Sequence, residues 1–214
     1  MLDVFIPAFV TLLVIIDPPG CAPIFASLTA GTSTRHQRLM AIRSVAMAAA
    51  ILLTFALAGE ALLGALGISL DAFRTAGGVL LFIIAMDMVF EKRTERRETR
   101  AEKVAREAET KHVSLEEEDI SVFPMAIPMI AGPGSIATTM LLTAKQPGWE
   151  GQAVVLAALA AVLAITLAAL LAAGPLMRLM GKTISGVITR LLGVLLAALA
   201  AQFVFDGIRH TFMG

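Results

Sequence analysis

Cysteine, tryptophan, tyrosine and histidine are almost missing from this chain. Its 214 residues include one cysteine, one tryptophan, three histidines and no tyrosine. The single Cys21 excludes a disulfide framework within the chain, and His36, His112 and His210 lack the spacing of zinc ligands. The sequence also offers no nucleophile paired with a base. We therefore expect no metal site, no cofactor and no enzymatic activity.

The chain also lacks an excess of charge of either sign. Its 17 Lys and Arg balance 17 Asp and Glu, so the formal net charge is +0. Hydrophobic residues, by contrast, make up 57% of the chain. They form continuous Ala, Leu and Val runs, which predict helices, because the strands of a membrane barrel alternate over about ten residues. The predicted fold class is an all-α polytopic membrane protein.

Six apolar segments approach or exceed the length of about 20 residues that spans a bilayer. The third is short unless it extends back through residues 70–76. No basic residue precedes the first segment, so we expect it to be retained and not cleaved as a secretory signal. We therefore predict six transmembrane helices, at about 4–28, 40–66, 76–90, 121–143, 152–176 and 187–206.

Residues 91–119 interrupt the apolar pattern with eight Lys or Arg and ten Asp or Glu. Opposite charges at helical spacing, as in Glu102 and Arg106, predict a solvated, partly helical linker. The mixed signs argue against a nucleic-acid partner. The linker separates a first three-helix repeat, residues 1–90, from a second, residues 120–214.

The basic residues are distributed unevenly over the loops. With six spans, 14 of the 17 Lys and Arg fall on the side of the linker, and three fall on the other side. The positive-inside rule then predicts a cytoplasmic linker and both termini outside. In a bacterial inner membrane, the termini would be periplasmic.

The strongest interruption of an apolar segment is Asp17–Pro23, which holds three prolines, a glycine and a carboxylate. These residues cannot continue one membrane helix without freeing backbone carbonyls and amides. The interruption must therefore face protein or a water-filled cavity. A carboxylate near the bilayer centre costs about 2.5–3.5 kcal/mol on insertion scales, so we interpret the break as a site.

The two halves of the chain contain matching motifs. At an offset of 114 residues, Ile16–Gly20 aligns with Ile130–Gly134; at 115, Gly78–Leu81 aligns with Gly193–Leu196. Because each half holds three spans, the second half enters the membrane in the opposite sense. We therefore predict a 3+3 inverted repeat with helices 1 and 4 interrupted near the midplane, where transporters of this design bind substrate.

Each interruption has the pattern of a helix start. Asp17 before Pro18 is a cap followed by a proline at the first helical position, and Gly132 before Pro133 is a weaker version. Free amides at such a start hold anionic groups. Asp17 either caps its helix alone or also meets a substrate ammonium or a proton, and the glycines serve either packing or anion binding. The candidate substrate-binding residues are Asp17, Pro18, Pro19, Gly20, Cys21, Gly132, Pro133, Gly134, Ser135 and Thr138.

Three further polar residues lie within the spans. Asp87 and Gln202 correspond at an offset of 115, and Glu60 lies near the outer end of the second span. They are candidates for coupling or gating, with a structural hydrogen bond at Asp87 and an interfacial position at Glu60 as the alternatives. The default expectation for Thr138, and for Thr29 and Thr139, is a hydrogen bond to the backbone of their own helix. Cys21 would then be a small packing residue.

Two motifs resemble the MarC family of bacterial inner-membrane proteins, also called the small neutral amino acid transporter family. They are Ile16–Gly20 with Pro23–Phe25, and Pro128–Ile136. The resemblance covers essentially the whole chain. It implies six spans, a 3+3 inverted arrangement by similarity to the wider LysE-type exporters, and transport of small neutral amino acids.

Two functions from different classes are compatible with these features. The first is a secondary transporter, an exporter or exchanger, for a small zwitterion such as alanine or glycine. The second is a scaffold or assembly protein that presents the charged linker to a cytoplasmic partner. The expected partners are a small solute and the bilayer, with a homo-oligomer allowed.

Overall fold

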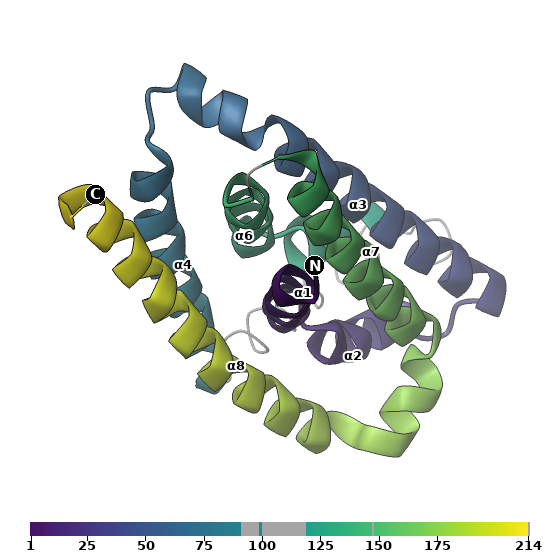
Figure 1. Cartoon of the computed structure of the whole chain (residues 1–214). Coiled ribbons are helices and arrows are strands. Elements are labelled where there is room, and N and C mark those ends of the chain that lie inside the picture. Colours follow the sequence, from purple (N-terminus) through teal and green to yellow (C-terminus); the bar gives the residue numbers. More distant parts are fainter. Residues whose placement is uncertain (91–98, 100–118, 147, 214) are drawn as a thin grey trace.

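The computed structural model describes residues 1–90, 99, 119–146 and 148–213, and these residues are almost entirely helical (Figure 1). The predicted linker, 91–119, lies outside the described residues except at its residues 99 and 119. The all-helical prediction is confirmed for the described part, which contains no strand. Its elements are α1 (Leu2–Ile16), α2 (Pro18–Leu28), α3 (Thr34–Ala65), α4 (Leu70–Val89), η1 (Ser121–Ile130), α6 (Pro133–Ala144), α7 (Trp149–Leu171) and α8 (Ala173–Met213).

Five stretches of the described chain are long and apolar enough to cross a membrane. A sixth is added if η1 and α6, bent by 55° at their junction, form one span. The third predicted segment does extend back, because α4 begins at Leu70. Ser69 caps this helix by accepting a hydrogen bond from the Ala72 amide at 3.2 Å, as Ser33 caps α3 through the His36 amide.

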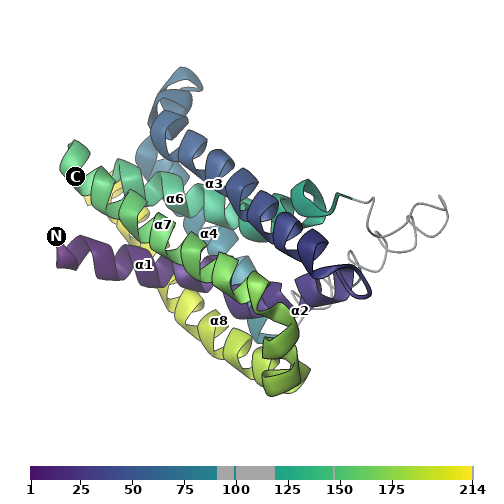
Figure 2. The same ribbon diagram turned by 90° about the vertical axis from the view of Figure 1, so that its right-hand side faces the viewer.

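Both chain ends lie on the same side of the helix bundle, as Figure 2 shows. The turn between α2 and α3 and the junction between α7 and α8 lie toward the other side (Figure 2). The first core cluster joins α1, α2, α3, η1 and α7 through side chains such as Leu12, Phe25, Leu52, Met125 and Leu159. The broken segments therefore lie inside the bundle, covered by the longer helices.

Helices α4 and α8 form the most extensive helix pair, and each approaches the other through a glycine. A Cβ on Gly78 would lie 2.9 Å from the Ala200 carbonyl oxygen, with Val204 beside it. A Cβ on Gly193 would lie 3.1 Å from the Ala85 carbonyl oxygen, with Val89 beside it. Both glycines are therefore required for close backbone contact between the two helices.

Asp119 connects the start of η1 to α3. Its carboxylate accepts hydrogen bonds from the amide and the hydroxyl of Ser121 and pairs with Arg43 at 3.3 Å. The Ser121 hydroxyl, together with the Arg43 guanidinium, lowers the pKa of the Asp119 carboxyl. About half of each charged side chain is exposed, so solvent screens this pair and it mainly fixes the position of η1.

Candidate functional site

The first break is a single residue, Asp17, between α1 and α2. Its φ of 57° and ψ of 64° place it in the left-handed region, which ends α1 and turns the chain into α2. The Asp17 amide donates to the Leu13 carbonyl at 3.0 Å, and one carboxylate oxygen accepts the Gly20 amide at 3.1 Å. Asp17 therefore caps the end of one helix and the start of the next, as the sequence pattern predicts for α2.

The Asp17 carboxylate lies wholly inside the protein, with no exposed surface. The same oxygen that accepts the Gly20 amide also accepts the Thr189 hydroxyl of α8 at 3.3 Å. Thr189 is itself buried. Burial of a carboxylate inside a membrane protein is costly, and ionisable groups at such positions usually have a functional role. The cap accounts for the position of Asp17, and its complete burial makes it a candidate for such a role as well.

The residues after Asp17 pack into protein. Pro18 occupies the first helical position, where a missing amide costs nothing, and it is buried. Pro19 and Gly20 are half-buried. Cys21 is fully buried, and its thiol donates to the Ile16 carbonyl at 3.4 Å. The sequence allows this break to face either protein or a water-filled cavity. In the structure, it faces the protein interior.

The second break, between η1 and α6, is built from glycines and has no side-chain cap. A Cβ on Gly132 would collide with the carbonyl oxygen of Pro128. A Cβ on Gly134 would lie 2.6 Å from the end of the Ile84 side chain on α4. The packing interpretation of both glycines therefore has direct support. Pro133 is exposed and begins α6, as predicted.

Four buried hydroxyls follow on α6, at Ser135, Thr138, Thr139 and Thr143. Ser135 is 2% exposed, and its carbonyl accepts the Thr139 hydroxyl at 2.7 Å. Thr29 bonds back to its helix in the same way. Thr138 does not, and its buried hydroxyl has no hydrogen-bond partner among the described residues. An unpaired buried hydroxyl costs about 1–3 kcal/mol, which makes Thr138 the most informative polar group on α6.

The three coupling candidates lie on three other helices, α3, α4 and α8. Glu60 is exposed on α3, which suits the interfacial position considered above. Gln202 is exposed on α8 and donates to Asp206 one turn later at 2.7 Å. Asp87 is half-buried near the end of α4. Of the three, only Asp87 is partly shielded from solvent. In the described part of the chain, no group of His, Cys, Asp and Glu is arranged to hold a metal ion.

Sequence reasoning missed Thr189 as a site residue. The signal was present, because Thr189 is the only hydroxyl-bearing residue in the sixth predicted span, 187–206. The sequence does not show that α8 places Thr189 beside Asp17, which lies 172 positions earlier in the chain.

Comparison with known proteins places this arrangement in a family. Residues 2–212 match the profile described as "MarC family integral membrane protein". The chain belongs to the MarC family. A UPF0056 membrane protein of Methanocaldococcus jannaschii is 38% identical, with 97% of each chain covered. YvbG of Bacillus subtilis is 32% identical, with 99% of this chain and 97% of YvbG covered.

The MarC family membership shows that the two breaks belong to a membrane protein. The inner membrane protein YhgN of Escherichia coli K12 is 32% identical, with 98% of each chain covered. This chain is therefore an integral membrane protein, and the family resemblance of its two motifs is confirmed. No solved structure matches the MarC chain. None of these relatives' names states a substrate.

Proposed function

We propose that this MarC protein is a secondary transporter, an exporter or exchanger, of small neutral amino acids such as alanine and glycine. The observation that carries the proposal is the fully buried Asp17 carboxylate at a helix break inside the bundle. Ionisable groups inside membrane proteins are expensive and usually belong to a substrate or proton pathway. A substrate ammonium supplies the positive charge that such a carboxylate favours.

The second break supplies groups for the other end of a zwitterion. Helix α6 begins at Pro133, and Gly132 before it provides no side-chain cap, so the first amides of α6 are available to a carboxylate. The unpaired Thr138 hydroxyl, one turn beyond the buried Ser135, is a further donor. In the proposed transporter, Asp17 faces the substrate ammonium and the α6 terminus faces its carboxylate.

The proposal includes the 3+3 inverted repeat. Gly78, Ala85 and Val89 of α4 correspond to Gly193, Ala200 and Val204 of α8 at an offset of 115. Each glycine packs against the other helix's equivalent carbonyl and valine, so the contact is reciprocal. A two-fold relation between the halves produces such reciprocity, which supports the repeat.

A binding measurement tests the proposed substrate class. Alanine should raise the apparent melting temperature of the purified protein, because a ligand that binds only the folded state stabilises it. Ethylamine, which lacks the carboxylate, and propionate, which lacks the ammonium, should each have little effect. Equal stabilisation by propionate and alanine would contradict the role of Asp17, and no response to any small neutral amino acid would contradict the proposal.

The proposed orientation places the linker in the cytoplasm and both termini in the periplasm of a bacterial inner membrane. The common side of the two chain ends in Figure 2 and the 14 basic residues on the linker side support it. Reporter fusions after His112 should read cytoplasmic, and fusions after Gly214 should read periplasmic. A cytoplasmic signal from the Gly214 fusion would rule this orientation out.

A further inference from the structure

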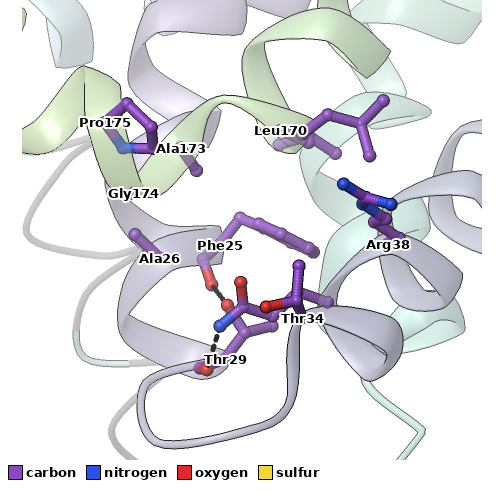
Figure 3. Close-up of a pocket in the computed structure, with 11 residues that line it drawn as sticks. Phe25, Ala26, Thr29, Thr34, Arg38, Leu170, Ala173, Gly174 and Pro175 are labelled. Carbon is purple, nitrogen blue, oxygen red and sulfur yellow. Dashed lines mark hydrogen bonds between the residues drawn. The ribbon is translucent and has the colours of Figure 1, made fainter.

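A cleft of about 410 Å³ lies at the far end of α2 from Asp17, where α2, α3, α7 and α8 meet. Its volume falls within the range of about 300–1,000 Å³ that is usual for ligand sites. Figure 3 shows its walls. None of the candidate site residues predicted from the sequence lines it, so it is separate from the two helix breaks.

One wall of the cleft is polar and positively charged. Thr34 and Arg38 are four residues apart and therefore share a face of the first turns of α3. The Arg38 guanidinium extends toward Phe25 and Leu170 across the cleft (Figure 3). The start of α3 adds the positive end of its helix dipole, capped only by Ser33. This wall is suited to an anion.

No acidic residue lines the cleft, and Arg38 has no hydrogen bond or ion pair within the described part of the chain. Arg43, five residues further along α3, has Asp119 as its partner. The Arg38 side chain is exposed where it lines the cleft, so a ligand can reach its guanidinium. The planar donors of a guanidinium suit a phosphate.

The opposite wall is apolar and is held in a fixed position. Phe25 and Leu170 are almost fully buried, whereas Leu171, at the end of the apolar helix α7, is 47% exposed. The Gln37 amide donates to the carbonyls of Thr29 and Thr32 at 3.1 and 3.3 Å, which fixes the α2–α3 turn beside the cleft. An occupant thus meets a cationic wall on one side and hydrocarbon on the other.

We propose that this cleft binds an anionic phosphate ester, with the phosphate on Arg38 and Thr34 and the organic part against the exposed Leu171. Such a group is carried by an anionic phospholipid or by a free organic phosphate. The cleft is formed at the ends of apolar helices, the depth at which basic pockets meet lipid headgroups. Occupancy would hold the α2–α3 turn against the α7–α8 junction.

The test compares Arg38→Gln with Arg35→Gln, which removes another exposed charge from the same helix outside the cleft. Thermal unfolding of each full-length variant is measured during titration with dihexanoyl-phosphatidylglycerol, dihexanoyl-phosphatidylcholine or glycerol 3-phosphate. The anionic lipid should stabilise the wild type and Arg35→Gln with the same apparent affinity. Arg38→Gln should bind it about tenfold or more weakly, and Thr34→Val should show a smaller loss.

The probes also separate the two sources of the phosphate. Stabilisation by the anionic lipid alone supports a headgroup, and an equal response to glycerol 3-phosphate supports a free organic phosphate. Phosphatidylcholine acting as strongly as phosphatidylglycerol would overturn the proposal. An equal loss in Arg35→Gln and Arg38→Gln would overturn it as well, because it would indicate only a general surface charge effect.

Discussion

If the protein transports alanine as proposed, Asp17→Asn is expected to abolish that transport and to leave the protein folded. The asparagine side-chain oxygen can still accept the Gly20 amide and the Thr189 hydroxyl, which both bond one oxygen of Asp17. Asparagine is also a preferred helix cap and tolerates the left-handed backbone found at this position. Asparagine thus keeps these two hydrogen bonds and lacks the negative charge. Flux in proteoliposomes should therefore fall to background while the melting temperature and the elution profile stay close to those of the wild type.

Asp17→Ala is the matched comparison. It removes the cap, which costs about 0.5–2 kcal/mol, and places a residue with a Cβ but no polar group in the left-handed region, which costs about 1–2 kcal/mol more. The alanine variant should thus lose both stability and flux. If Asp17→Asn transports alanine at the normal rate, Asp17 is a cap only, and the half-buried Asp87 becomes the next charge to examine.

Gly132→Ala is expected to destabilise the protein far more than Gly134→Ala, although both add one methyl group at the second break. At Gly132 the new Cβ meets the Pro128 carbonyl oxygen, and backbone cannot move away cheaply. At Gly134 it meets the terminal methyl of Ile84, which can rotate aside. Overpacking of this kind costs about 1–3 kcal/mol. The melting temperature should fall by several degrees in Gly132→Ala and change little in Gly134→Ala.

The alanine flux of Gly132→Ala and Gly134→Ala tests whether the position of the start of α6 matters for the proposed transport. Displacing the start of α6 moves its first amides and the Thr138 hydroxyl, so Gly132→Ala should lose most of its transport. Gly64→Ala is a control on α3, where a Cβ meets no atom within 4 Å. Equal stability of Gly132→Ala and Gly64→Ala would show that the close contact with Pro128 does not constrain the second break.

The position of the first break could be predicted because its cause is local. Proline lacks an amide and restricts the residue before it, which predicts a break next to Pro18. The predicted interruption, Asp17–Pro23, was too long, because the break is Asp17 alone and Pro18–Pro23 belong to α2. The left-handed conformation of Asp17 and its bond to Thr189 depend on how α8 packs, which no local pattern contains. The unpaired Thr138 is a second example, because the default bond to its own helix predicts the opposite.

The second break is more irregular than its sequence suggested. Gly132 and Pro133 predicted one interruption, whereas the backbone already leaves helical geometry at Phe123, Ile127 and Pro128 of η1. Pro124 and Pro128 within this segment are the local reason, because neither can donate a helical hydrogen bond. The cleft beside Arg38 could not be predicted, since it requires the ends of four helices to meet.

Counterflow of labelled alanine in proteoliposomes is the measurement that tests the proposed transport most directly. Vesicles loaded with unlabelled alanine and containing the wild-type protein should accumulate external label transiently above its equilibrium level. A variant lacking residues 95–115 should keep most of this flux, because transport is assigned to the helix breaks and not to the linker. If no small neutral amino acid shows counterflow with the wild type, and the deletion removes the protein's effect in cells, the chain is a scaffold acting through its linker and the transport account is wrong.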